Sequence, residues 1–343
     1  MLLSMNLVAP ASASPEASAL VHTTVVGSYP RVGDTHEEQK LRRAIAQFDK
    51  GEIADTDLRA VEREVVRDVL REQAEAGVEL VTDGQVTWYD SQSHVARRFE
   101  GVEIGGLIRY FDTNTYYRQP IVRGPIAWKA PVLADEWRYA QAHVSVGVKA
   151  VVPGPVTIAS LALNKHYATK RALALALAEA LASEVRTLAE AGARHIQVDE
   201  PILTRRPEDL RLVEETWTHL AEAKGRAELT LFVAFGDIAE VYRRVVRLPA
   251  DRIGLDLVQG AKTWAQIEAD GADKPLVLGL VDARNTRPED PADVAARLQG
   301  LRRELDLEEC WLSPSNGLEF LPRAKAREKL AIVVEAARLA GVA

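Results

Sequence analysis

Residues 276–285 read Leu-Val-Leu-Gly-Leu-Val-Asp-Ala-Arg-Asn, an unbroken apolar run that ends in charged and polar residues. An apolar run without polar alternation is typical of a strand buried on both faces of a parallel sheet. The polar residues after it would stand at the carboxyl end of that strand. The same pattern recurs along the chain, and its recurrence decides the predicted fold.

Eight short apolar runs are predicted as strands, and longer amphipathic segments separate them. The predicted strands are His22–Gly27, Glu79–Thr82, Lys149–Val152, His195–Val198, Leu229–Val233, Ile253–Leu257, Leu276–Val281 and Glu309–Leu312. The predicted helices are Asp57–Glu75, Thr169–Ala191, Glu208–Ala223, Ile238–Val246, Trp264–Ala269, Pro291–Leu305 and Ala324–Ala340. Strands that alternate with helices indicate an α/β fold, and eight repeats indicate a (β/α)8 TIM barrel.

An open doubly wound sheet is the alternative architecture. It usually carries a glycine-rich phosphate loop after its first strand. Residues 27–31 here read Gly-Ser-Tyr-Pro-Arg and contain no such loop, which favours the barrel.

Two segments depart from the simple alternation and predict insertions on the βα loops. Thr35–Gly51 has the pattern of an added helix, and Ser91–Ala134 that of an inserted hairpin and loop. Residues 1–20 are rich in Ala, Ser and Pro and are interpreted as a disordered leader, or as the product of a start codon placed too far upstream. Residues 21–343 are predicted to form a single barrel domain.

Composition excludes several classes of protein. The chain has 343 residues and a net charge of −7, from 43 basic and 50 acidic residues, which gives no sign of nucleic-acid binding. Its one cysteine, Cys310, rules out an internal disulfide framework and a multi-cysteine metal site, and is interpreted as inert packing in a cytoplasmic protein. No apolar run approaches the roughly 20 residues that a membrane span needs.

Polar residues gather just after the predicted strands, where a barrel places its active site. The candidate site residues are Gly27, Ser28, Arg31, Asp83, Gln85, Asp199, Asp256, Asp282, Arg284 and Asn316. An Asp at a strand end is often a helix N-cap, as expected for Asp237, but four at four strand ends favour a polar pocket. Carboxylates can hold an ammonium group, and Arg31 or Arg284 can hold a carboxylate. The set therefore indicates an amino-acid-like ligand.

Motifs at these same positions resemble the cobalamin-independent methionine synthase family. The most telling are Val26–Pro30, Thr82–Gln85, Phe111–Asn114, Gly154–Thr157, Gln197–Pro201, Leu255–Val258, Gly279–Asn285 and Pro314–Leu318. The length corresponds to a single-barrel core member. The resemblance implies transfer of a methyl group to homocysteine, with Gly27, Ser28 and Asp199 binding homocysteine. It also implies a zinc ion on the homocysteine thiol.

The zinc ligands of the family are not matched in this sequence. Phe232, Ala234 and Asn316 stand where the family has His, Cys and Cys. Asp256 stands in place of the fourth ligand, a Glu, and one carboxylate cannot build a zinc site alone. No metal site is therefore predicted, although zinc is the cofactor that the family would supply.

Two further departures concern the site itself. Gln85 replaces an acidic residue and Arg284 replaces a His. Several segments, Phe111–Tyr117, Asp199–Leu203 and Asp282–Asn285, resemble the non-zinc N-terminal barrel of the two-barrel members.

These observations leave three hypotheses. The first is a methyltransferase that acts on homocysteine or a related thiol, with Asp199 and Arg284 as catalytic residues and Arg284 stabilising the thiolate by charge. Its methyl donor would be methyltetrahydrofolate or methylcobalamin on a corrinoid protein. The alternative is a non-catalytic subunit that binds folate or homocysteine and works with a separate zinc-bearing barrel. The third is a decarboxylase-like barrel, whose pocket should carry more Arg than these strand ends offer.

Overall fold

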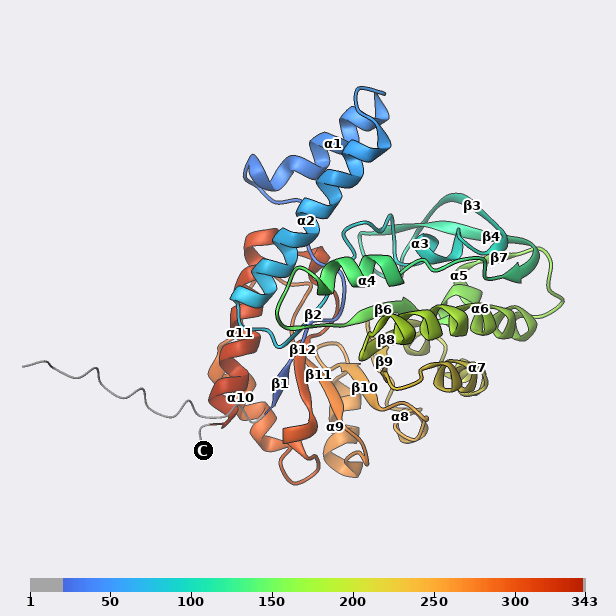
Figure 1. Cartoon of the computed structure of the whole chain (residues 1–343). Coiled ribbons are helices and arrows are strands. Elements are labelled where there is room, and N and C mark those ends of the chain that lie inside the picture. Colours follow the sequence, from blue (N-terminus) through green and yellow to red (C-terminus); the bar gives the residue numbers. More distant parts are fainter. Residues whose placement is uncertain (1–20, 342–343) are drawn as a thin grey trace, which may run out of the picture.

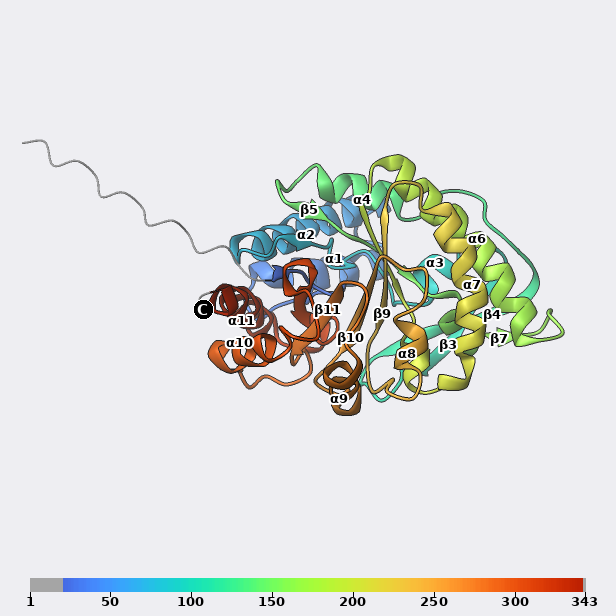
Figure 2. The ribbon, with the colours of Figure 1, turned by 90° about the horizontal axis from the view of Figure 1, so that it is seen from below.

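The computed structural model describes residues 21–341 of the 343-residue chain. The predicted leader, residues 1–20, lies outside the described residues. Figure 1 shows the whole arrangement and Figure 2 shows it from below.

The centre of the molecule is a curled sheet of seven parallel strands (Figure 1). Their order is β1-β12-β11-β10-β9-β8-β6, so successive strands along most of the chain are neighbours in the sheet. The strands are β1 (His22–Thr23), β6 (Ala150–Pro153), β8 (His195–Asp199), β9 (Glu228–Val233), β10 (Arg252–Asp256), β11 (Leu276–Val281) and β12 (Trp311–Pro314). The predicted parallel α/β sheet is confirmed.

The strand β2 (Leu80–Val81) makes backbone contacts with both flanks of this sheet. Thr24, directly after β1, forms a parallel bridge with Leu80. On its other side β2 pairs in parallel with β5 (Gly147–Val148), and the Lys149 N–H donates to the Val81 carbonyl at 2.8 Å. Only Lys149 separates β5 from β6. The predicted third strand, Lys149–Val152, thus corresponds to β6, and β5 lies directly before it.

Helices cover the outside of the sheet, as Figure 2 shows for α6, α7, α10 and α11. The helices are α1 (Lys40–Asp49), α2 (Asp55–Glu75), α3 (Ser93–Ala96), α4 (Ala134–Gln141), α5 (Pro155–Leu161), α6 (Lys170–Ala191), α7 (Leu210–Ala223), α8 (Tyr242–Val245), α9 (Ala261–Asp270), α10 (Pro291–Gly300) and α11 (Arg323–Gly341). Helix α6 begins where Thr169 Oγ1 accepts the Ala172 N–H at 3.1 Å, an N-cap. It ends at Gly192, whose φ of 105° is the left-handed conformation expected of a C-cap glycine.

Both segments that depart from the alternation contain the predicted elements, a helix in the first and a hairpin in the second. The first consists of the 3-10 turn η1 (Glu37–Gln39) followed by α1, which packs on α2. The second contains the antiparallel hairpin of β3 (Glu100–Arg109) and β4 (Tyr116–Ala127). The short strand β7 (Leu163–Asn164) adds to β4 in parallel. The turn of this hairpin, residues 110–115, reaches the carboxyl ends of the central strands.

Several predicted boundaries were wrong, among them the ends of β1 and α10, and for two others local side-chain bonds give the reason. The helix predicted over Ile238–Val246 is shorter in the structure, where only Tyr242–Val245 forms α8. At its predicted start, the Ile238 N–H donates to Thr263 Oγ1 of α9 at 2.9 Å, and this bond holds the segment outside the helix. The last strand begins at Trp311 rather than Glu309, because Asp306 accepts the Glu308 N–H and starts the 3-10 turn η4 (Leu307–Glu309). Single-residue caps of this kind override the apolar pattern.

The core lies on both faces of the central strands. All six residues of β11 and all four of β12 are buried, as expected from their unbroken apolar runs. Three short 3-10 turns complete the fold: η2 (Pro201–Thr204), η3 (Pro207–Asp209) and η5 (Leu318–Phe320). Two of them, η2 and η5, follow β8 and β12 at the edge where the predicted site residues gather.

Candidate active site at the strand ends

A small cavity opens at the carboxyl ends of β1, β8, β9 and β12, and we call it the mouth cavity. Its volume is about 40 Å³. It brings together five of the predicted site residues, namely Gly27, Ser28, Gln85, Asp199 and Asn316. The other lining residues are Val26, Ser91, Tyr110, Pro201, Phe232, Ala234, Phe235, Gly317, Glu319 and Phe320. The mouth cavity is thus polar on one side and aromatic on the other.

Asp199, the last residue of β8, supplies the carboxylate at the base of the mouth cavity. Its Oδ1 accepts the Gln197 Nε2–H at 2.7 Å. Burial raises the pKa of Asp199 to about 7, and the hydrogen bond from Gln197 and the charge of Lys149 work against that rise. An ammonium group in the mouth cavity would stabilise the ionised form of Asp199.

Beneath Asp199 lies a buried lysine that the sequence analysis did not select. The Lys149 side chain is 4% exposed, and its Nζ donates to the Val25 carbonyl at 2.5 Å and to Gln197 Oε1 at 2.7 Å. Gln197 also donates to the Val26 carbonyl at 2.6 Å. Burial lowers the pKa of Lys149 to about 7. Lys149, Gln197 and Asp199 therefore form one chain of polar side chains inside the sheet.

The signal that could have revealed Lys149 was its place in the apolar run of residues 146–153, which is otherwise free of charge. A lysine inside a buried strand needs partners, because a buried charge without them is strongly unfavourable.

Asn316 brings an unpaired acceptor into the same cavity. Its side chain is 1% exposed, and its Nδ2 donates to Ser315 Oγ at 3.2 Å. Its Oδ1 finds no hydrogen-bond donor among residues 21–341. A buried acceptor without a donor is costly, by about 1–3 kcal/mol. A ligand N–H group in the cavity would satisfy it.

Aromatic rings close the opposite side. Phe235 stacks with Phe111 at 5.8 Å between ring centroids and meets the edges of Tyr110 and Phe320 at 5.9 Å each. Tyr110 and Phe111 come from the β3–β4 turn, so this turn lies over the mouth cavity. These rings explain why the cavity is small.

Three non-glycine residues at or beside the mouth cavity have positive φ angles. They are Gln85 (52°), Phe111 (49°) and Phe235 (70°). Such conformations are unfavourable for residues with a Cβ atom and persist only where surrounding contacts hold them. For Phe235 one such contact is Asp256 Oδ2, which accepts the Phe235 N–H at 3.1 Å.

Asp256 and Glu200 support the site from behind. Asp256 is 1% exposed and also accepts the N–H groups of Val258 and Gln259, and burial raises its pKa to about 6. Glu200 accepts N–H groups of Val156 and Thr157 at 2.9 and 2.8 Å, at the start of α5, and burial raises its pKa to about 7. Both carboxylates hold backbone in place rather than face the cavity.

The remaining predicted residues lie outside the lining of the mouth cavity. Arg31 donates to the carbonyls of Val86 and Trp88. Asp282 accepts the Arg284 N–H at 2.8 Å. Asp83 faces a different cavity, between α2 and α4. The structure therefore separates these three from Asp199.

Arg284 has a structural partner at the tip of the hairpin. Its Nη2 donates to the Asp112 carbonyl at 2.9 Å, and the Asp112 carboxylate pairs with Arg205. Two arginines thus hold the hairpin turn over the mouth cavity. This contact places the Arg284 guanidinium at the hairpin turn, outside the lining of the mouth cavity.

The residues at the family's zinc positions do not fit that ion. Phe232 and Ala234 present only carbon atoms to the mouth cavity, and zinc requires N, S or O ligands. Across residues 21–341 no three His, Cys, Asp or Glu side chains come close enough together to hold a metal ion.

A curled parallel sheet that presents a carboxylate, a buried amide and glycine backbone at its carboxyl edge is the arrangement of an α/β enzyme with a small-molecule site. Residues 21–339 match the family model described as the catalytic domain of cobalamin-independent synthase. The chain belongs to this family, the cobalamin-independent methionine synthases, and is a methyltransferase.

Two relatives of known family agree with that assignment. The chain is 32% identical over 322 residues to a methionine synthase of Saccharolobus solfataricus, covering 93% of this chain and 95% of that one. It is also 32% identical to a methionine synthase of Sulfurisphaera tokodaii over 329 residues, covering 93% and 92%.

The fold is similar to a B12-independent methionine synthase from Shewanella sp. W3-18-1 in complex with selenomethionine. The TM-score is 0.77 at 20% identity, with 93% of this chain and 97% of that chain covered. A putative vitamin-B12-independent methionine synthase from Listeria monocytogenes gives a TM-score of 0.71 at 21% identity, covering 97% and 98%. Between residues 21 and 341, no helix combines the length and apolar character needed to cross a membrane.

Proposed function

We propose that this methyltransferase moves a methyl group to the thiol of homocysteine, or of a closely related amino-acid thiol, in the mouth cavity. The observation that carries the proposal is that the Asp199 carboxylate and Asn316 Oδ1 line the same cavity, and that this Oδ1 has no hydrogen-bond donor among residues 21–341. A carboxylate and a free acceptor together suit an α-ammonium group. The related Shewanella protein is complexed with selenomethionine, itself an amino acid of this kind.

We further propose that the curled sheet, together with β2 and β5, is the (β/α)8 barrel predicted from sequence. The bridge from Thr24 to Leu80 and the pairing of β2 with β5 support closure. In such a barrel the backbone N–H groups of Gly27 and Ser28 can receive the substrate carboxylate. The side chain of the substrate would then extend toward Phe232 and Ala234.

In the transfer step the thiol sulfur forms the new S–C bond and loses its proton. The methyl donor, methyltetrahydrofolate or methylcobalamin on a corrinoid protein, keeps the electron pair of the bond that breaks. A free thiol has a pKa of about 8.5, so near neutral pH most of it is protonated. The side chains of this cavity offer no zinc ligand set to lower that value, and the proposed reaction is therefore zinc-independent.

The test is methionine formation from homocysteine by the purified full-length protein, with methyltetrahydrofolate and methylcobalamin offered in parallel. We expect turnover with one donor, and the same rate after treatment with a chelator. Loss of activity with the chelator, restored by added zinc, would overturn the zinc-independent reaction. Absence of turnover with both donors, in protein shown to be folded, would overturn stand-alone activity.

One observation favours a second candidate function. The apolar side chains of Phe232 and Ala234 at the family's zinc positions also suit a barrel that leaves catalysis to a partner. This barrel would bind homocysteine or folate and work with a separate zinc-bearing barrel. Turnover that appears only after a chain with the His-x-Cys motif is added would establish this function.

A further inference from the structure

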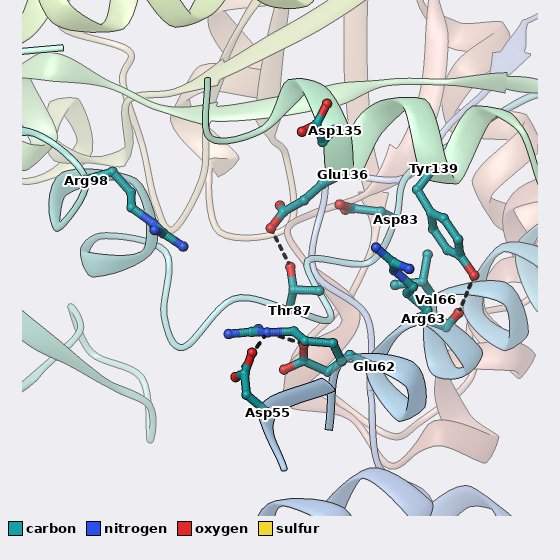
Figure 3. Close-up of a pocket in the computed structure, with 11 residues that line it drawn as sticks. Asp55, Glu62, Arg63, Val66, Asp83, Thr87, Arg98, Asp135, Glu136 and Tyr139 are labelled. Atoms are coloured by element: carbon teal, nitrogen blue, oxygen red, sulfur yellow. Dashed lines mark hydrogen bonds and ion pairs between the residues drawn. The ribbon is translucent and has the colours of Figure 1, made fainter. Parts of the chain in front are cut away.

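A second and larger cavity lies away from the mouth cavity, between α2, α4 and the turn after β2 (Figure 3). Its volume is about 470 Å³, and we call it the charged cavity. We propose that the charged cavity binds a free α-amino acid, with the ammonium group at Asp83 and Glu136 and the carboxylate at Arg98. This site is separate from the proposed substrate site.

The inner wall of the charged cavity carries three carboxylates, and they differ in their partners. Glu62, 8% exposed, pairs with Arg59 at 2.8 Å. Glu136 accepts from Thr87 Oγ1 at 3.0 Å, from Trp88 Nε1 at 3.3 Å and from His94 Nε2 at 3.1 Å. Asp83 receives only the backbone N–H of Gln85, at 2.9 Å, and makes no ion pair within residues 21–341.

The environment of Asp83 favours a cation beside it. Burial and the neighbouring charge of Glu136 together raise the pKa of Asp83 to about 6, against the opposing effects of the Gln85 N–H and His94. Figure 3 shows Asp83 and Glu136 directed into the same part of the cavity. An ammonium group between them would relieve their mutual repulsion and could hydrogen-bond to both.

Two arginines of the rim supply positive charge, beside the carboxylates of Asp55 and Asp135, which also line the charged cavity. Neither Arg63 nor Arg98 makes an ion pair with any carboxylate between residues 21 and 341. The Arg63 guanidinium lies over the Tyr139 ring, 5.5 Å from its centroid. Arg98 extends toward the cavity from the side opposite Tyr139 (Figure 3). A guanidinium group without a carboxylate is a ready partner for one.

This distribution of charge selects the class of ligand. A metal ion does not fit, because no suitable group of three ligands occurs in the part of the chain that the structure describes. A phosphate or other simple anion would face the carboxylates of Asp83 and Glu136. A zwitterion presents an opposite charge to each kind of side chain, and an α-amino acid carries its ammonium and carboxylate groups on the same carbon atom.

The experiment is calorimetric titration of the full-length Asp199→Asn protein, in which binding to the mouth cavity is weakened. L-Methionine is the first probe and the other nineteen amino acids follow. We expect at least one to bind at a single site. Its binding should weaken roughly tenfold or more in Asp83→Asn and in Arg98→Met, as loss of a charge-assisted bond predicts. Arg211→Met, an exposed arginine on α7, is the matched control and should change nothing.

Two analogues of the amino acid that binds test the need for both charges. For methionine these are 3-(methylthio)propylamine, which lacks the carboxylate, and 4-(methylthio)butanoate, which lacks the ammonium group. We expect both to bind at least roughly tenfold more weakly.

The proposal is overturned if no amino acid binds, if either analogue binds as well as the amino acid, or if both cavity variants bind normally. The measurement is made in Asp199→Asn and detects binding only, so its result does not depend on whether the protein transfers a methyl group.

Discussion

The mouth cavity and the charged cavity differ in size, lining and the origin of their residues. The mouth cavity has about 40 Å³ and is bordered by aromatic rings and a few polar groups, whereas the charged cavity has about 470 Å³ and is lined mostly by charged side chains. The residues of the mouth cavity follow strands far apart in sequence. Those of the charged cavity come from residues 55–139, on α2, α4 and the loops around them.

The charged cavity, the larger of the two, does not lie where the carboxyl ends of the parallel strands converge. The carboxyl ends of the strands place Asp199, Gly27 and Asn316 together through the sheet itself, so their geometry is fixed by the core. The charged cavity depends on long side chains on helix surfaces, which adjust more freely. A rigid site suits chemistry, and a surface cavity suits reversible binding.

Loss of the Asp199 carboxylate is the strongest test of the mouth cavity. Asp199→Asn should lower kcat/KM for homocysteine by about 100-fold, because a charge-assisted bond to the ammonium group is lost. Steady-state kinetics measure the change, and Asp273→Asn, on an exposed loop, is the control. A rate within twofold of the unchanged protein would show that the mouth cavity is not the substrate site.

Lys149→Met should have the next largest effect, with a distinctive dependence on pH. The positive charge of Lys149 lowers the pKa of Asp199, so its removal should raise that pKa above about 7. Asp199 must be ionised to hold an ammonium group, and activity should therefore rise at higher pH in the variant than in the unchanged protein. At pH 7 we expect a loss of about tenfold.

The pH profile of kcat/KM checks this effect, and Lys149→Arg, which keeps the charge, should restore the original profile if it folds. A lower activity with an unshifted profile would mean that Lys149 only supports the packing.

Arg284→Met should have a smaller effect, and it distinguishes positioning from direct catalysis. If Arg284 only holds the hairpin turn through Asp112, KM should rise about threefold while kcat is kept, since a partly exposed hydrogen bond contributes about 0.5–1.5 kcal/mol. Arg205→Met should behave in the same way, because Arg205 pairs with the same residue. Abolished turnover in Arg284→Met alone would instead support direct stabilisation of the thiolate.

The smallest effect is expected for Thr87→Val, a change at the charged cavity that lowers the stability of the protein. The change removes the hydrogen bond from Thr87 Oγ1 to Glu136, and we expect the free energy of unfolding to fall by about 1 kcal/mol. Urea denaturation followed by circular dichroism measures it, and Thr218→Val, on the exposed face of α7, is the control. A loss well beyond that amount would show that the charged cavity is mainly a structural ion network.

The apolar runs of the sequence were sufficient to predict the parallel sheet, and the two segments that break their alternation contain the predicted helix and hairpin. The runs of β9, β10 and β11 matched within two residues at each end, because strands buried on both faces need apolar side chains at every position. The boundaries of α8 and β12 were missed because single side chains, Thr263 and Asp306, capture backbone N–H groups there. The short helices α4 and α5 were not predicted, since two turns leave little periodic signal.

The sequence alone also selected part of the lining of the mouth cavity. Strand-end position selected Gly27, Ser28, Gln85, Asp199 and Asn316, all of which line the mouth cavity. It selected Asp83, Asp256 and Asp282 on the same grounds, and the tertiary structure assigned them to another cavity or to backbone support. Position along a strand fixes the edge at which a residue lies, but not the direction of its side chain.

Only the tertiary structure revealed the buried chain of Lys149, Gln197 and Asp199 and the hairpin turn over the mouth cavity. Hydrogen bonds from Lys149 to Gln197 and from Arg284 to the Asp112 carbonyl join residues 48 and 172 positions apart. Such contacts depend on how strands and loops come together in space, and local residue patterns do not predict them. Local pattern therefore determined which elements form, and long-range packing determined which of their side chains meet.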